Sequence, residues 1–421
     1  MRTLYSLVIL LALPLIALRL AWRARRQPAY LQHVGERFGC YAKGTAPAQP
    51  LLWLHAVSVG ETRAAEPLVR ALLREHPNHH ILLTHMTPTG RETSASLFAA
   101  DAARVTRCYL PYDYPGAVAR FLAHFKPCAG ILMETEIWPN LVHACNARAI
   151  PVYLVNARLS EKSFAGYLRV GALARDAVCG LAAIAAQSAD DARRFTELGA
   201  AKVSVTGNLK FDVAPSAVQR MVGEHLREGF GPRRVLLAAS TRDGEENLIL
   251  NNKLYDIPDT LLVLVPRHPQ RFDEVAALLD QQHIAYQRRS ANETVRAETR
   301  VLLGDSMGEM VAYYAACDVA FIGGSLLPLG GQNLIEACAV GKPVLIGPHT
   351  HNFAEATERA ITAGAAVRVM DAADLQRKAA ALLANPKVTE RMSAAALAFS
   401  GEHRGATTRL IELIRFPGAG G

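Results

Sequence analysis

Short apolar runs alternate with stretches of helical periodicity from residue 51 onward. An apolar run followed by an amphipathic stretch such as Arg63–Glu75 or Asp190–Leu198 is typical of a βα unit, and a series of such units predicts a parallel sheet covered by helices. The expected strands are Leu51–His55, Ile81–His85, Ala129–Met133, Val152–Val155, Ala182–Ala186 and Val203–Thr206 in a first series, and Val235–Ala239, Leu261–Val265, Val301–Leu303, Val319–Ile322 and Val344–Ile346 in a second. The pattern therefore predicts an α/β protein with two doubly wound domains.

The segment Asn208–Ser216, rich in turn-forming residues, separates the two series and is the expected hinge. Residues 1–26 are expected to form a separate amino-terminal helix, followed by domains 27–210 and 211–421. Open α/β sheets bind ligands beyond the carboxyl ends of their strands. Two such domains facing each other would hold substrates in the cleft between them.

The segment from Thr3 to Trp22 is almost entirely apolar. A helix of about 20 residues can cross a bilayer core of about 30 Å. Three arginines follow the segment at positions 23, 25 and 26, so the positive-inside rule places the rest of the chain in the cytoplasm. A cleaved signal peptide is the alternative, but no small-residue cleavage site follows the apolar stretch. A buried core helix fits less well, because the segment has no polar face.

The net charge limits the classes of partner, and the cysteine content indicates the redox compartment. The net charge of +8 and the pI near 9.2 favour an anionic partner: nucleic acid, anionic lipid or a phosphorylated substrate. No nucleic-acid-reading motif is present, and Lys and Arg are dispersed, so nucleic acid is the weakest of the three. The seven cysteines include no CxxC pair, which suits free thiols in a reducing compartment.

Acidic residues follow two strands of the first series. Glu61 lies in the loop AVSVGET after the first strand, where Gly60 would permit a tight turn. At a strand's carboxyl end Glu61 could be a catalytic group, or it could only cap the next helix. Glu134 and Glu136 come just after the strand Ala129–Met133, and two carboxylates so close suggest an acid/base site, although one of them could be a cap.

Basic and glycine-rich loops follow the strands of the second series. Arg267 and His268 come after a strand, where a guanidinium could bind a phosphate or carboxylate, or form an ordinary salt bridge. The loops LLGDSMGEM and FIGGSLLPLGGQNLIEACAVGKPVLIG each join a strand to a helix through glycines. The second loop, with a helix expected near Asn333 and Glu336 in its first turn, is moderately specific for a nucleotide.

Several motifs are absent from the sequence. There is no Asp-x-Asp, so a metal site for a sugar diphosphate is not supported, and there is no GxxxxGK[ST] or GxSxG. The pair His349 and His351 has no third or fourth ligand nearby in the sequence and is interpreted as loop histidines, not a zinc site.

Taken together, the motifs resemble the Kdo (3-deoxy-D-manno-octulosonic acid) transferases of lipopolysaccharide assembly, which have the GT-B glycosyltransferase architecture. The matching segments, in order, are HVGERFG, LWLHAVSVGET, THMTPTGRE, YLPYD, METEIWPNL, NARLS, GNLKFD, STRDGEE, VPRHPQRF, GDSMGEM, GGSLLPLGGQN and GPHTHNF. The resemblance implies inverting transfer of Kdo from CMP-Kdo to the lipid A precursor lipid IVA, without metal or cofactor and with release of CMP. It also implies a location at the cytoplasmic face of the bacterial inner membrane.

The resemblance assigns roles to particular residues. Glu61 would be the base, with Glu134 and Lys210 stabilising the transition state, in an acceptor-binding first domain. The expected CMP-Kdo contacts, in the second domain, are Pro266, Arg267, Met307, Gly308, Glu309, Asn333, Leu334, Ile335 and Glu336. Two departures concern this donor site: Gln332 and Leu334 stand where relatives often carry His and Pro, and Arg242 replaces a common His.

Two other functions stay open on the residues alone. A nucleotide-sugar epimerase or a UDP-sugar transferase can use the same two-domain architecture and a similar glycine-rich loop. A lipid-binding scaffold with degenerate sites is the non-catalytic alternative, against which stands the full set of acidic and cationic groups at strand ends.

Overall fold

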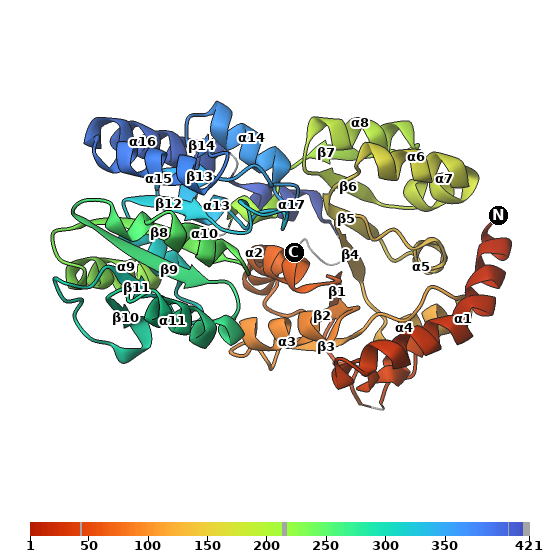
Figure 1. The fold of residues 1–421 in the computed structure, drawn as a ribbon. Coiled ribbons are helices and arrows are strands. Elements are labelled where there is room, and N and C mark those ends of the chain that lie inside the picture. The colour runs from red at the N-terminus through yellow and green to blue at the C-terminus, as the bar shows by residue number, and fades with distance from the viewer. Residues whose placement is uncertain (43, 213–216, 403, 416–421) are drawn as a thin grey trace. The chain divides into compact units, whose positions relative to one another are not determined.

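A computed structural model of the chain describes residues 1–42, 44–212, 217–402 and 404–415. It divides into two compact units, of which the first holds residues 1–212 and the segment from 404 onward, and the second holds the residues between. Each unit is built on a seven-stranded parallel sheet with helices on both faces (Figure 1). The expected doubly wound α/β fold is confirmed for both. The expected hinge lies outside the described residues at positions 213–216.

The sheet of the first unit has the strand order β3-β2-β1-β4-β5-β6-β7. Its strands are β1 Leu51–His55, β2 His80–His85, β3 Val105–Tyr109, β4 Ala129–Met133, β5 Val152–Ala157, β6 Ala183–Ala186 and β7 Val203–Val205. The direction of winding reverses between β1 and β4, and such a switch point opens a crevice at the carboxyl ends of the two strands.

Helices cover both faces of this sheet, and the apolar side chains between form two core clusters. The helices are α1 Arg2–Ala24, α2 Val59–Glu75, α3 Pro88–Leu97, α4 Pro115–Phe125, α5 Pro139–Asn146, α6 Glu161–Val170, α7 Ala172–Cys179, α8 Ala189–Glu197 and α17 Ala406–Leu413. The carboxyl-terminal α17 belongs here because Ala406 and Leu410 are buried in the same core as β1 and β4. The expected domain 211–421 differs from the structure in this respect, since its last helix packs on the first unit.

The second unit repeats the plan, with strand order β10-β11-β9-β8-β12-β13-β14 and the switch point between β8 and β12. Its strands are β8 Arg234–Thr241, β9 Thr260–Pro266, β10 Tyr286–Arg288, β11 Val301–Leu303, β12 Val319–Ile322, β13 Val344–Ile346 and β14 Ala366–Arg368. Its helices are α9 Ala217–Gly229, α10 Glu245–Asn251, α11 Phe272–Gln281, α12 Met310–Ala316, α13 Ile335–Ala339, α14 Ala354–Thr362, α15 Ala372–Leu383 and α16 Pro386–Glu402.

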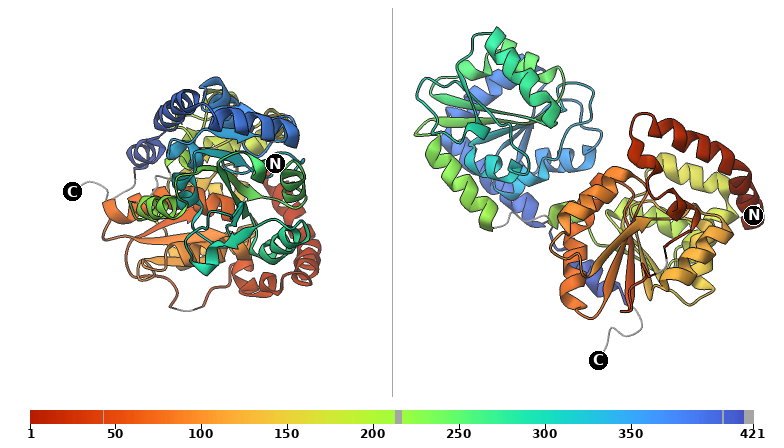
Figure 2. Two further views of the ribbon diagram at one scale, coloured as in Figure 1. Left: turned by 60° about the vertical axis from the view of Figure 1, so that its left-hand side comes forward. Right: turned by 90° about the horizontal axis from the view of Figure 1, so that it is seen from below.

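The helix α1 lies along the outside of the first unit (Figure 2) and contacts α5. Its buried or half-buried side chains recur at helical spacing and are Tyr5, Ser6, Ile9, Ala12, Leu13, Ile16, Leu20 and Ala24. Near its start, the hydroxyl of Tyr5 donates to the buried carboxylate of Asp113 at 3.0 Å, and Ser6 donates to Asn140 at 3.0 Å. The opposite stripe is exposed and apolar, with Leu4, Leu7, Val8, Leu11, Leu15, Leu18 and Trp22. Figure 2 shows the helix, in dark red, along the outside of this unit.

Candidate active site and donor loops

Glu61 lies in the first turn of α2, directly beyond the end of β1. Its carboxylate accepts hydrogen bonds from the amide of Val57 at 2.8 Å and the hydroxyl of Ser58 at 3.2 Å, while the Ser58 hydroxyl caps the helix. The arrangement is close to a capping box, but Glu61 accepts from the amide of Val57, the residue before the N-cap, instead of from the amide of the N-cap Ser58. The helix begins at Val59, so the expected tight turn at Gly60 is wrong: Gly60 is already helical.

The carboxyl group of Glu61 also has a raised pKa. Burial raises the pKa of Glu61 from its ordinary value of 4.5 to about 7; the Val57 amide opposes the rise, and the charges of Glu134 and Glu136 add to it. A base works best when its pKa lies near the operating pH. Glu61 therefore has the protonation behaviour of a general base while it caps its helix.

Glu134 follows β4 and brings a second carboxylate to the switch point. Its backbone is left-handed, with φ of 57°, which few residues other than glycine adopt without strain, and its amide donates to Val155 on β5 at 3.0 Å. Glu136 accepts a hydrogen bond from the Trp138 ring nitrogen at 2.7 Å, and burial raises its pKa. Two neighbouring strand ends thus bring three carboxyl groups to one region.

Lys210 lies in the 3₁₀ turn η3, Leu209–Asp212, which follows the last strand of the same sheet. Leu209 and Phe211 on either side are buried, so the turn is fixed to the core while Lys210 is half-buried. The amide of Lys210 donates to the side chain of Asn208 at 2.9 Å. All three residues expected to be catalytic therefore belong to the first unit.

In the second unit, Pro266 is the last residue of β9 and Arg267 follows it, as expected. The amide of Arg267 donates to Thr241 at 2.9 Å, which ties the start of this loop to the end of β8. Arg267 is half-buried.

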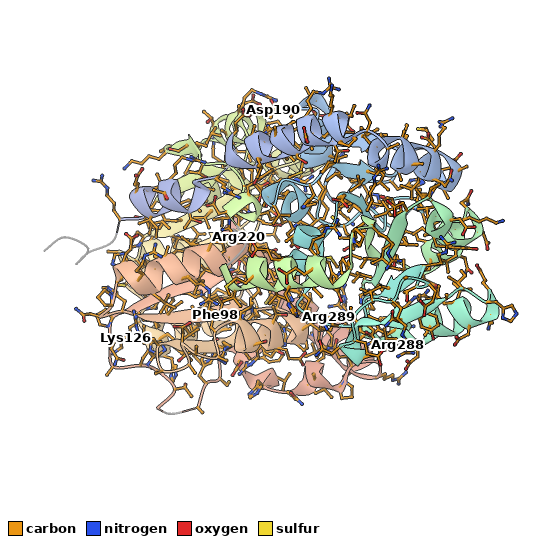
Figure 3. All side chains as sticks on the ribbon, turned by 90° about the vertical axis from the view of Figure 1, so that its left-hand side faces the viewer. Phe98, Lys126, Asp190, Arg220, Arg288 and Arg289 are labelled. Carbon is orange, nitrogen blue, oxygen red and sulfur yellow. The ribbon has the colours of Figure 1, made fainter. Side chains whose placement is uncertain are left out.

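The loop GDSMGEM connects β11 to α12 and carries three of the expected donor contacts. Gly308 has φ of 84°, and Met307 is exposed. Glu309 accepts hydrogen bonds from Arg289 at 3.0 Å and from Ser306 at 2.5 Å. Arg289 is labelled in Figure 3. The carboxylate of Glu309 is thus partly engaged by the protein itself.

The glycine-rich loop after β12 is held by a carboxylate that the sequence analysis gave no role. Glu245, at the start of α10, is fully buried and accepts from the amides of Gly324 at 2.5 Å, Ser325 at 3.0 Å and Leu326 at 3.0 Å. It also accepts from the amide of Arg242 at 2.9 Å. These bonds join the ends of β8 and β12 across the switch point. The segment STRDGEE could have indicated this role, because it places two adjacent glutamates shortly after a strand.

The segment from Asn333 to Glu336 opens the short helix α13 close to the expected position. The side chain of Asn333 accepts from the amide of Ile335 at 3.0 Å and donates to Glu336 at 3.1 Å. Leu334 and Ile335 are buried in the core, so only their backbone atoms are placed to touch a ligand.

Two departures noted in the sequence lie beside one glycine. A methyl group added at Gly324 would lie 3.1 Å from the amide nitrogen of Gln332 and 3.5 Å from Cγ of Arg242. Gly324 also has φ of 69°. Arg242 and Gln332 therefore flank the same turn of the loop.

His349 and His351, which are not expected to bind zinc, lie in the loop that follows β13, beside the glycine-rich loop. The amide of His349 donates to Ser325 at 3.0 Å. Within residues 1–42, 44–212, 217–402 and 404–415, no group of three or more His, Cys, Asp or Glu side chains is arranged to hold a metal ion.

Two doubly wound units with loops at the carboxyl ends of both sheets are the plan of the GT-B fold, which is common among glycosyltransferases. A family model described as glycosyl transferases group 1 matches residues 281–398, within the second unit. The crystal structure of a UDP-GlcNAc 2-epimerase from Neisseria meningitidis bound to UDP-GlcNAc is similar, with a TM-score of 0.58 and 17% identity over 86% of this chain and 99% of that one. Identity this low shows the shared fold alone.

The sequence relatives define the family. A family model described as 3-deoxy-D-manno-octulosonic-acid transferase matches residues 32–213. The 3-deoxy-D-manno-octulosonic acid transferase of Bordetella pertussis is 46% identical, over 98% of each chain, and that of Haemophilus influenzae is 38% identical, also over 98% of each. The chain belongs to the 3-deoxy-D-manno-octulosonic acid transferase family and is a glycosyltransferase for Kdo.

Proposed function

We propose that the enzyme transfers Kdo from CMP-Kdo to lipid IVA with inversion at the anomeric carbon, and releases CMP. The observation that carries the proposal is Glu61, a carboxyl group with a pKa of about 7 at the switch point of the first unit, in a chain of this family. An inverting transfer needs one base to take the proton of the acceptor hydroxyl as it attacks. Glu61 has the required protonation behaviour.

We propose that side chains neutralise the charges of the donor. Kdo carries a carboxylate and CMP leaves as a phosphate monoester, so cationic groups can stabilise the transition state without a divalent ion. Lys210 in the first unit and Arg267 in the second are the groups we assign to this task. Glu134, strained beside the base, would contribute to stabilising the developing positive charge on the sugar.

The donor is assigned to the second unit. The carboxylate of Glu245 binds the amides of Gly324, Ser325 and Leu326 and so fixes the start of the glycine-rich loop at the ends of β8 and β12. Glycine in this loop lets a phosphate approach the chain closely. Pro266, Met307, Gly308 and the segment from Asn333 to Glu336 belong to loops at the same edge of the sheet.

A direct experiment tests substrate, stereochemistry and metal requirement together. Purified enzyme is incubated with CMP-Kdo and lipid IVA in EDTA, and the product is analysed by mass spectrometry and NMR. We expect CMP, one or more added Kdo residues and an inverted anomeric centre. A product formed only with a divalent ion, or with the configuration retained, would refute the mechanism, and turnover of UDP-sugars would refute the donor assignment.

We also propose that α1 attaches the protein to the inner membrane, with the catalytic units in the cytoplasm. Support comes from a helix of 23 residues, whose most apolar stretch of 18 residues has a mean hydropathy of 2.3, and from the arginines that follow it. The exposed stripe from Leu4 to Trp22 is the surface assigned to the lipid, because the opposite stripe already packs on the protein. The arginines would interact with anionic headgroups.

Removal of residues 1–26 tests this attachment. We expect the truncated protein to shift from the membrane pellet to the soluble fraction and to retain activity on detergent-dispersed acceptor. The loss of the contacts to Asp113 and Asn140 should lower the melting temperature by a few degrees. A truncated protein that still pellets fully with membranes would move the anchor to another surface.

A further inference from the structure

The end of β5 carries a buried asparagine in an unusual backbone conformation. Asn156 has φ of 51° and no exposed surface, and the pairing of β5 with β6 shifts its register between Leu154 and Ala157. Asparagine tolerates a left-handed backbone better than most residues, but glycine does so at lower cost. The backbone alone therefore does not explain why a side chain is present.

The Asn156 side chain reaches the turn that bears Lys210. Its Oδ1 accepts a hydrogen bond from the amide of Leu209 at 3.0 Å. A second path runs through side chains: Gln187 donates to the Asn156 carbonyl at 2.8 Å and accepts from Asn208 at 3.0 Å, and Asn208 in turn accepts from the amide of Lys210 at 2.9 Å. Two successive amides of η3 are thus held from the end of β5.

The opposite end of the turn is fixed independently. The carboxylate of Asp212 accepts from the amides of Gly405, at 2.7 Å, and Thr407, at the start of α17. With its neighbours buried, Lys210 is carried by a turn whose two ends are both hydrogen-bonded, so the position of its backbone is fixed.

The same strand end also supports the other candidate stabiliser. The residue before Asn156, Val155, accepts the amide of Glu134 at 3.0 Å, and Glu134 is left-handed as well. In addition, Nδ2 of Asn156 is buried without a hydrogen-bond partner among the described residues. A buried polar atom left unsatisfied is costly, and such costs concentrate at functional sites.

We propose that Asn156 is a positioning residue for Kdo transfer, whose side chain sets the place of Lys210 through the amide of Leu209. The Gln187–Asn208 pair, which starts from the backbone carbonyl of Asn156, is a second support that remains when the side chain is removed. The inference rests on the catalytic role proposed for Lys210. Its physical basis is that a cation stabilises a transition state only from a fixed position, and a displacement of about 1 Å can cost about 100-fold in rate.

The test is the substitution Asn156→Gly, which keeps the left-handed backbone and removes only the side-chain acceptor. We expect kcat to fall by about 10- to 100-fold, with the KM for CMP-Kdo within about twofold of wild type. Asn156→Asp keeps an acceptor for Leu209 and is expected to retain more activity than Asn156→Gly. It also provides a measurement if the glycine variant does not fold.

Two comparisons separate positioning from general damage. Asn140→Ala removes another buried asparagine of the first unit, one whose side chain donates to Asp113 at 2.8 Å, and should lower the melting temperature with kcat unchanged. In a double-mutant cycle, Asn156→Gly combined with Lys210→Ala should be no slower than Lys210→Ala alone, because the network acts through that lysine.

The outcomes are distinguishable. The positioning role would be overturned if the losses in kcat of the two single variants multiplied in the double variant. It would also be overturned if Asn156→Gly kept the wild-type kcat while Lys210→Ala was strongly impaired. Either result would leave the proposed function standing. A fully active Lys210→Ala would instead remove the catalytic assignment of Lys210, and the inference with it.

Discussion

The substitution Glu61→Gln separates the chemistry of this residue from its structural role. Glutamine is accepted at this position of a capping box, so the hydrogen bond with the Val57 amide can be kept. Glutamine cannot accept the proton of the acceptor hydroxyl. Turnover should therefore fall by about 10²- to 10⁴-fold, the usual contribution of general-base catalysis.

The pKa of Glu61 determines how the stability of Glu61→Gln differs from that of wild type as the pH changes. Because burial holds the pKa of Glu61 at about 7, above its ordinary 4.5, ionisation of this group destabilises the folded protein as the pH rises from 4.5 to 7. The difference between these two pKa values corresponds to about 3 kcal/mol above pH 7. The glutamine variant lacks this loss, so relative to wild type it should gain stability as the pH rises through that window.

The assay measures both quantities on the same protein. Melting temperatures of wild type and Glu61→Gln are compared at pH 5 and pH 8, and transfer rates are compared at saturating CMP-Kdo. The wild-type rate should rise with pH up to about 7 as the base ionises. A folded variant that keeps more than about a tenth of the activity would refute Glu61 as the base, because general-base loss costs at least about 100-fold.

Three further substitutions test other residues that we assign to the site, one in the first unit and two in the second. Arg267→Ala should raise the KM for CMP-Kdo by about 10- to 100-fold, from loss of a charge-assisted contact of about 1.5–3 kcal/mol, while the KM for lipid IVA stays unchanged; weakened lipid use alone would place Arg267 outside the donor site. Glu245→Gln replaces an acceptor oxygen of the Gly324 loop by a donor and should weaken CMP binding in calorimetry by a similar factor. Glu136→Gln removes a charge that raises the pKa of Glu61, so the acidic limb of the rate profile should move to lower pH.

The apolar pattern was sufficient to predict most of the fold. The buried strands β1, β4, β11, β12 and β13 have the predicted bounds, because a strand covered on both faces is a continuous apolar run. Three strands were missed: β3, β10 and β14. All three lie at sheet edges and contain an arginine, so they lack a continuous apolar run.

The position of a polar residue after a strand was sufficient to predict which residues lie at the candidate site. It was not sufficient to predict the hydrogen-bond partners of these residues. Glu61, Glu134 and Arg267 lie at strand ends as predicted. Glu245 and Asn156 act through backbone amides of segments distant in sequence, and no local pattern reveals such pairs. The place of α17 in the first core was missed for the same reason, since an amphipathic helix does not specify which sheet it covers.

The helix-end contacts of Glu61 and the base role that we propose for it are compatible, because the same contacts serve both. The amide of Val57 and the hydroxyl of Ser58 favour the ionised carboxylate and fix its orientation. Burial and the charges of Glu134 and Glu136 oppose ionisation more strongly. The hydrogen bonds alone would leave a fully ionised carboxylate with little affinity for a proton, and burial alone would leave a neutral group unable to accept one. Their balance near pH 7 gives a carboxylate that is held in place and still basic enough to take a proton from a sugar hydroxyl.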